Sequence, residues 1–256
     1  MAYKIVRFGD VILPHRMSTD DLGTGSVDSP LVKTLGGAFD VENGERRLPV
    51  IRRIRHQGLY VGSDDLDLQI KIDAIKAKLG TVDQLWRQRH DGVEQWLPAR
   101  LLSVRHEVAV DEHFARLADM QIDFAAIGSV WRADTQTSIS SPLGMGLTTV
   151  AVANGGAETV DDAIIHIVAT SAISNVDIRL GSAHLIYGAL VSGDNLAIDC
   201  GRLTVTVNGS DAYANFSPGT DHGIDGWLQF EPGSNSLEIT IDGTANLTVQ
   251  FYEQYI

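Results

Sequence analysis

The sequence has almost no cysteine, because Cys200 is the single one among 256 residues. No disulfide can form within the chain, which excludes a small extracellular scaffold stabilised by disulfides. The chain also lacks any run near the roughly 18 apolar residues of a membrane span. Its first residues, MAYKIVRFGDVILP, contain no uncharged run long enough for the core of a signal peptide. We therefore expect a chain that is made in the cytoplasm and does not insert into a membrane.

Positive charge is scarce in the second half of the chain. The whole sequence has 20 Lys/Arg and 33 Asp/Glu, for a net charge of −13. Residues 1–132 carry 18 basic and 19 acidic side chains, whereas residues 133–256 carry 14 acidic side chains against Arg179 and Arg202. A surface with so few cations repels nucleic acid and anionic membranes. Solubility alone would also account for this charge.

The sequence motifs of common enzymes and metal sites are missing as well. There is no His-x-x-x-His, no Cys-x-x-Cys and no Gly-x-Ser-x-Gly. The glycines of LGTGSVDS (22–29) are not followed by the Lys-Ser/Thr of a phosphate-binding loop. We therefore predict no catalytic, cofactor-binding or metal-binding residue. A carboxylate pair of a glycosidase on a jelly roll is the remaining enzymatic alternative, although 14 acids in the second half would place some pair at a suitable distance by chance.

A few single residues need an interpretation. Cys200, in AIDCGRL, is expected to be a small core or edge residue. His166, in AIIHIVA, is expected to be a satisfied core or sheet-face histidine. Some aromatic side chains of the second half are expected in the core, with stacking against a sugar as the alternative. These aromatic residues are Tyr213, Phe216, Trp227 and Tyr252.

The first half mixes strands with one helix. Residues 17–30 are rich in turn formers and predict a polar loop, and Asn43-Gly44 predicts a hairpin. The strand at the end of this half is the clearest, because Met120, Ile122 and Phe124 alternate with polar residues. Strands are expected over residues 3–14 (ended by Pro14), 48–62, 94–110 and 118–132.

One helix is expected near residues 65–79. Apolar residues recur there at i, i+4, i+7 and i+11, namely Leu68, Ile72, Ile75 and Leu79. Ser63 or Asp64 is the expected N-cap, and Gly80 is expected to stop the helix. The acidic run SDDLDL therefore fits a helix start better than a calcium loop. Residues 81–90 are expected to add another helical turn or two.

The second half reads as nearly pure β-structure after a boundary. Residues 133–146 are rich in Ser, Thr and Gly and predict a linker. Short alternating runs separated by Gly, Asn and Asp then favour a β-sandwich or jelly roll. These runs cover residues 147–154, 160–172, 175–181, 203–209, 236–243 and 246–256.

The segment GWLQFEPGSNSLEITIDG (226–243) predicts two adjacent strands. Pro232 presets φ and Gly233 permits the positive φ of a type II turn between them. The side chains expected to face inward are Leu228, Phe230, Leu237, Ile239 and Ile241.

The order of these features resembles the distal tail protein family of siphovirus-type bacteriophages, which have long non-contractile tails. In the second half, the resemblance lies in residues 193–213, in 226–243 and in the closing run 247–256. In the first half it lies in residues 58–104 and in MQIDFAAIGSVWR (120–132).

The resemblance implies a mainly β protein of two domains. Residues 1–132 would form a tail-tube-like β-sandwich or barrel with one flanking helix, and this domain would build a ring. Residues 133–146 would be the linker, and 147–256 a peripheral galectin-like or jelly-roll β-sandwich.

The resemblance also implies a structural virion protein that is not an enzyme. Members form a homohexameric ring in the phage tail tip, between the tail tube protein and the tail-tip hub or fibre proteins. The ring leaves a channel through which DNA passes without specific binding. Residues 62–68 or 111–123, whichever face inward, would make that channel acidic. The alternative is a carbohydrate-binding module or minor tail protein that contacts host-surface glycans.

Overall fold

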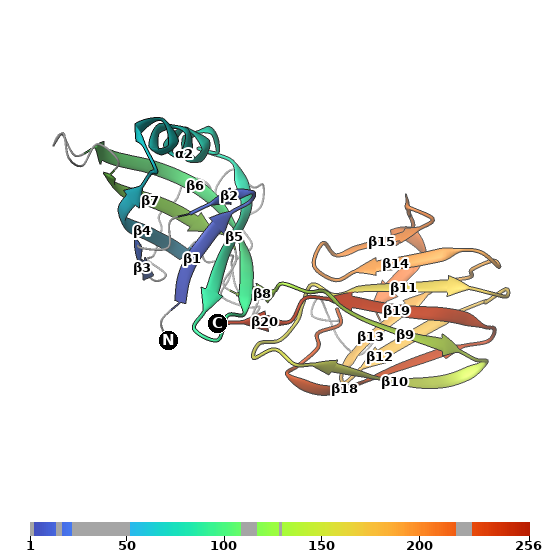
Figure 1. Ribbon diagram of the computed structural model, residues 1–256. Coiled ribbons are helices and arrows are strands. Elements are labelled where there is room, and N and C mark those ends of the chain that lie inside the picture. Colours follow the sequence, from blue (N-terminus) through green and yellow to red (C-terminus); the bar gives the residue numbers. More distant parts are fainter. Residues whose placement is uncertain (1–2, 14–16, 22–51, 109–116, 128–129, 219–226) are drawn as a thin grey trace, which may run out of the picture. The chain divides into compact units, whose positions relative to one another are not determined.

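The computed structural model describes residues 3–13, 17–21, 52–108, 117–127, 130–218 and 227–256. The chain divides into two compact units, Met1–Trp131 and Arg132–Ile256 (Figure 1). Strand β8 (Trp131–Ala133) spans the division. No helix in the described part of the chain is long and apolar enough to cross a membrane.

The first unit is built on a curled antiparallel sheet with strand order β2-β1-β5-β6-β7-β4-β3. Strands β1 and β3 also contact each other, so the sheet curls back on itself. Its strands are β1 (Tyr3–Phe8), β2 (Val11–Ile12), β3 (Met17–Asp21), β4 (Arg52–Val61), β5 (Val82–Arg89), β6 (Glu94–Val108) and β7 (Leu117–Ala126).

The core of the first unit lies on the concave side of this sheet. Met120, Ile122 and Phe124 of β7 are all buried, which confirms the alternation predicted for this strand. The ring of Phe124 contacts Phe8 of β1 at a centroid distance of 5.3 Å, so β7 packs across the core onto a distant strand. Burial of this aromatic pair therefore stabilises the curled sheet, because it joins β7 to β1 across the core.

Helix α2 (Asp65–Ala77) confirms the predicted helix and corrects its apolar face. Asp64 is the N-cap, and its carboxylate accepts a hydrogen bond from the Asp67 N–H at 2.8 Å. The prediction that Leu79 belongs to the apolar face is wrong, because Leu79 lies beyond the end of the helix and is 52% exposed. Gly80, at φ +78°, turns the chain into β5 and donates its N–H to Leu101 O. The buried face consists of Leu68, Ile72 and Ile75.

The helical turns predicted for residues 81–90 are wrong, because Val82–Arg89 form strand β5. This strand is hydrogen-bonded on both sides, to β1 and to β6. Trp86 lies opposite Trp96 of β6, with ring centroids 6.4 Å apart. Cross-strand aromatic pairing and hydrogen bonding to two neighbouring strands outweigh the weak helical propensity of this segment.

Two further predictions for the first unit are corrected. Residues 3–12 form a hairpin of β1 and β2 rather than one strand, because Gly9 turns the chain at φ +56°. Residues 17–21, predicted as loop, form strand β3 along the edge of β4. The Asn43-Gly44 hairpin and the stop at Pro14 lie outside the described residues.

The second unit is a sandwich of two antiparallel sheets, as predicted for the second half. One sheet has the order β10-β18-β12-β13-β17 and the other β16-β15-β14-β11-β19-β9. Their strands are β9 (Thr137–Leu143), β10 (Gly146–Asn154), β11 (Ile164–Ala169), β12 (Val176–Leu180), β13 (Ala183–Tyr187), β14 (Asn195–Asp199), β15 (Thr204–Val207), β16 (Ser210–Asp211), β17 (Phe216–Pro218), β18 (Gly233–Ile241) and β19 (Ala245–Phe251). The short helix η1 (Tyr213–Asn215) precedes β17, and β20 (Gln254–Tyr255) ends the described elements.

The linker prediction for residues 133–146 is corrected by β9, which occupies Thr137–Leu143 within it. This strand pairs with β19 along its whole length, from Leu143 opposite Ala245 to Thr137 opposite Phe251. The side chains of this segment are mostly small and polar, and those on one face of β9 are exposed. Pairing with β19, which is distant in the sequence, therefore defines this strand, rather than an apolar pattern within the segment.

The predicted hairpin over residues 226–243 is also wrong. Residues 233–241 form β18, but this strand pairs with β10 and β12 and not with the residues before it. Phe230 instead makes an isolated bridge with Val160. The inward row is nevertheless confirmed, because all five predicted side chains are buried: Leu228, Phe230, Leu237, Ile239 and Ile241.

The bend before β18 depends on Gly233, whose φ is +101°. The Asn235 side chain fixes this bend by donating to Glu231 O at 2.8 Å and accepting from the Glu231 N–H at 3.0 Å. We expect Gly233→Val to destabilise the second unit by about 1–3 kcal/mol, because a β-branched residue is strained at positive φ. Ser236→Val, on the exposed side of the same strand, is the control and should change stability by less than about 0.5 kcal/mol. Thermal melting checks both, and equal melting temperatures would contradict the positive φ.

Candidate functional surfaces

Strands β4, β7 and β6 present one continuous polar face, here called the outer sheet face. Side chains alternate along each strand, so the residues opposite the core share one side. In register across the three strands, the rows are Arg53–Ala125–Arg100, Arg55–Asp123–Ser103, Gln57–Gln121–Arg105 and Leu59–Asp119–Glu107. Helix α2 lies on the other side of this sheet, because Leu68 of α2 lies against Gly62 and Asp67 lies near buried Tyr60.

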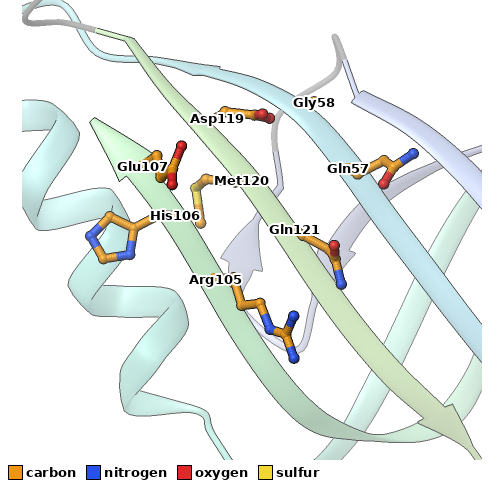
Figure 2. A pocket seen from close by; sticks show the side chains of 8 residues that line it. All are labelled: Gln57, Gly58, Arg105, His106, Glu107, Asp119, Met120 and Gln121. Atoms are coloured by element: carbon orange, nitrogen blue, oxygen red, sulfur yellow. The ribbon is translucent and has the colours of Figure 1, made fainter. Parts of the chain in front are cut away.

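A shallow hollow of about 590 Å³ lies over one end of the outer sheet face. Figure 2 shows Arg105, Glu107 and Gln121 along it, with His106 extending instead toward α2. Gln57 and Asp119 also line this hollow. It is open and polar, unlike the enclosed apolar pocket that a small-molecule ligand usually requires.

Charge is unevenly distributed along the outer sheet face. Asp119 and Glu107 lie opposite each other at one end. Arg53 and Arg100 flank Ala125 at the other end, and neither makes an ion pair within the described part of the chain. Arg105 lies in the row next to the Asp119–Glu107 pair, so the face carries four arginines against three carboxylates, and its net acidic part is the last row.

In the second row of the outer sheet face, the carboxylate of Asp123 neutralises the charge of Arg55 and accepts three hydrogen bonds. Asp123 accepts from Arg55 Nε at 2.8 Å, from Ser103 Oγ at 3.0 Å and from Gln121 Nε2 at 3.1 Å. Burial raises the pKa of Asp123, but these donors outweigh burial and hold its pKa below the ordinary value. The Arg55–Asp123 pair thus remains charged, and neutral overall, at physiological pH.

Cys200 and His166 occupy different environments in the second unit. Cys200 is buried, and burial raises the pKa of its thiol to about 12. His166 is half-buried on the outer side of the six-stranded sheet, where its Nδ1 lies 3.4 Å from Asn195 Oδ1. No group of three or more His, Cys, Asp or Glu among the described residues is placed to hold a metal ion.

The buried thiol gives a direct test. Because Cys200 is the single cysteine, a thiol reagent reports on this residue alone. At pH 8 we expect labelling of the folded chain to be at least about a hundredfold slower than labelling in denaturant, since little thiolate forms. Mass spectrometry over a time course measures both rates, and similar rates would show that Cys200 is accessible.

The aromatic residues considered for sugar stacking are only partly brought together. Phe216 is buried and lies between Tyr213, at a ring distance of 5.5 Å, and Trp227, at 5.2 Å. Tyr213 is 48% exposed, whereas Trp227 packs against the core. Tyr252 is half-buried just after β19. The exposed ring of Tyr213, next to buried Phe216 and partly buried Trp227, therefore offers a small surface for stacking against a sugar.

Sequence reasoning missed the outer sheet face. Its residues come from three strands, and paired neighbours lie between 12 residues apart (Glu107 and Asp119) and 72 residues apart (Arg53 and Ala125) along the chain. The available signal was the alternation of Arg53 and Arg55 with Ile54 and His56 in a strand that reads as basic on one side.

Comparison with known protein families gives one match, which lies within the second unit. Residues 155–255 match the family SPP1 Dit, siphovirus-type tail component, C-terminal domain. No curated protein matches the chain.

The whole chain is similar in fold to the crystal structure of SPP1 Dit (gp 19.1), described as a paradigm of the hub adsorption apparatus in Gram-positive infecting phages. This likeness has a TM-score of 0.58 at 14% identity and covers 99% of this chain and 94% of that one. Chains of the phage P2 baseplate, in its activated conformation with calcium or strontium, reach a TM-score of 0.38 at 10% and 9% identity, covering 97% of this chain and 90% of theirs. The second unit thus matches the siphovirus-type tail component family over residues 155–255, and the resemblance of the chain to phage distal tail proteins is confirmed.

Proposed function

We propose that the chain forms a homohexameric ring at the distal end of a siphovirus-type tail, joining the tail tube to the hub or fibre proteins. The family match of residues 155–255 carries this proposal, because the family is a tail component. The fold shared with SPP1 Dit over both units supports it. The ring would act as a structural part of the virion, and its work would be done by surfaces rather than by a catalytic group.

Electron microscopy with light scattering of the purified full chain tests the ring. The expected result is a six-fold ring with a mass about six times that of the 27.7 kDa chain, formed alone or on addition of the tail tube protein. A stable dimer would contradict the proposal. A chain that stays monomeric in the presence of the tube protein would contradict it as well.

The outer sheet face is the surface we assign to the channel wall. It is polar, lies opposite α2, and includes Asp119 and Asp123 from the 111–123 segment considered above. Residues 62–68 lie at the start of α2, on the other side of the sheet, and are therefore less suited to this role. Arg53, Arg100 and Arg105 restrict the acidic part of the wall to the Asp119–Glu107 row, where phosphates would be repelled.

Charge reversal tests the channel assignment. Asp119→Lys with Glu107→Lys should slow genome release from assembled particles, because two lysines per subunit would bind passing phosphates. Asp65→Lys with Asp73→Lys adds the same charge to exposed positions of α2 and should leave the release rate unchanged. Counting intact tails by electron microscopy separates slower release from failed assembly. The opposite pattern would assign the channel to the α2 side.

Glycan binding by the second unit is the second candidate, favoured by exposed Tyr213 on the Phe216–Trp227 pair. A glycan array probed with the full chain tests it. Saturable binding that is lost in Tyr213→Ala would support this function, and loss in Trp227→Ala would agree if the variant still folds. An array without saturable binding would reject it.

A further inference from the structure

Strand β10 is an unprotected sheet edge in the second unit. It ends the five-stranded sheet and pairs on one side with β18, from Gly146 opposite Ile241 to Asn154 opposite Gly233, with no register shift. No strand pairs with its other side in the described part of the chain. Its sequence, GLTTVAVAN, contains neither charge nor proline.

The three other edges of the same sandwich are protected in the ways that natural sheets use. Strand β16 has two residues and carries Asp211. Strand β17 has three residues and ends in Pro218. Strand β9 carries Pro142, which has no N–H to donate. β10, with nine residues, therefore differs from every other edge of this unit in both length and composition.

Two exposed apolar side chains lie at and just before the start of β10. Leu147, in the strand, is 63% exposed, and Met145, in the bend that precedes the strand, is 79% exposed. Added strands bind through main-chain hydrogen bonds, and alternate side chains supply the specificity. Met145 and Leu147 would provide such a side-chain contact beside the free main-chain groups.

The charge of the second unit selects the kind of strand that fits. Between residues 132 and 256 there are 14 acidic residues against Arg132, Arg179 and Arg202. Glu238 of β18 lies opposite Thr149 of β10 on one side and opposite Arg179 of β12 on the other. The net negative charge of the unit repels a second copy of the same unit and attracts a basic segment.

We propose that β10 is a docking edge for an extended, basic segment of another protein, which adds as a strand beside Gly146–Asn154. This edge is a property of the described part of a single chain, so the proposal does not depend on whether the chain forms a ring. Strand addition would extend the five-stranded sheet and satisfy the main-chain groups that β10 leaves open.

Peptide binding to the full chain tests the proposal. The probe is a short fluorescent peptide of alternating Thr and Val with a Lys at each end. The matched control peptide has the same sequence with a Glu at each end. We expect the Lys peptide to bind with a Kd below about 1 mM, and the Glu peptide to bind at least about tenfold more weakly. Hydrogen exchange should slow at the β10 amides and stay unchanged at β9.

One substitution and its matched control locate the site. Ala151→Lys places a charge on an exposed position of β10, as protected edges do, and should weaken binding of the Lys peptide at least about tenfold. Ser138→Lys adds the same charge to the exposed side of β9 and should change binding less than about twofold. Circular dichroism confirms that both variants fold.

Four outcomes would overturn the proposal. One is no binding of the Lys peptide at about 1 mM. Another is equal binding of the two peptides, and a third is binding that survives Ala151→Lys. The fourth is self-association of the free chain that Ala151→Lys abolishes, because a second copy would then be the occupant.

Discussion

Replacing Phe230 by alanine is expected to cost the second unit about 3–5 kcal/mol of unfolding free energy, because the change empties a large buried volume. The side chain is fully buried and its ring stacks on Phe251 at 5.8 Å, with an interplanar angle of 12°. The main chain of Phe230 also exchanges two hydrogen bonds of 2.9 Å with Val160, which fixes the ring in the core. Domains are typically stable by about 5–15 kcal/mol, so this loss is a large fraction of the total.

Urea denaturation, followed by circular dichroism, measures the effect, and hydrogen exchange at the β19 amides localises it to the second unit. Gln229→Ala is the matched control, because this neighbouring side chain is exposed and its loss should cost less than about 0.5 kcal/mol. A loss below about 1 kcal/mol for Phe230→Ala would show that residues 227–231 do not complete the core.

The second large effect is expected in the first unit, where Ile72→Ala should cost about 2–5 kcal/mol. Ile72 lies in the middle of the buried face of α2 and is fully buried, between Leu68 and Ile75. Truncation there leaves a cavity where the helix packs on the sheet. The helix itself should persist, since alanine has the highest helix propensity.

Leu79→Ala is the control that separates the observed helix face from the one predicted by periodicity. Leu79 fits the i, i+4, i+7, i+11 spacing but is 52% exposed, so its truncation should cost less than about 0.5 kcal/mol. Denaturation of the two variants under the same conditions gives the comparison. Equal losses would mean that the helix continues to Leu79 and buries it.

Local patterns were sufficient where one element buries one face. The period of 3.6 residues identified α2, and alternation identified β7 and most strands of the second unit. Local patterns failed where partners far along the chain decide the structure. Val82–Arg89 became a strand because β1 and β6 hydrogen-bond to both of its sides, and Thr137–Leu143 became one because β19 pairs with it.

The segment at residues 226–243 shows the same limit most clearly. Its composition correctly predicted a positive φ at Gly233 and five buried apolar side chains. Proximity in sequence suggested that its two halves pair, but β18 pairs with β10 and β12, and Phe230 bridges to Val160. Sheet pairing depends on burial and register across the whole sandwich, which a local turn signal does not encode.

The sequence by itself determined the fold class, the helix, the acidic second half and the resemblance to phage distal tail proteins. These properties depend on composition, on short periodicities and on the order of motifs along the chain. The tertiary structure alone decided which strands are neighbours, and therefore the outer sheet face and the free edge of β10. A surface built from several strands exists only once their register is set, because a shift of one residue would move every side chain to the opposite face.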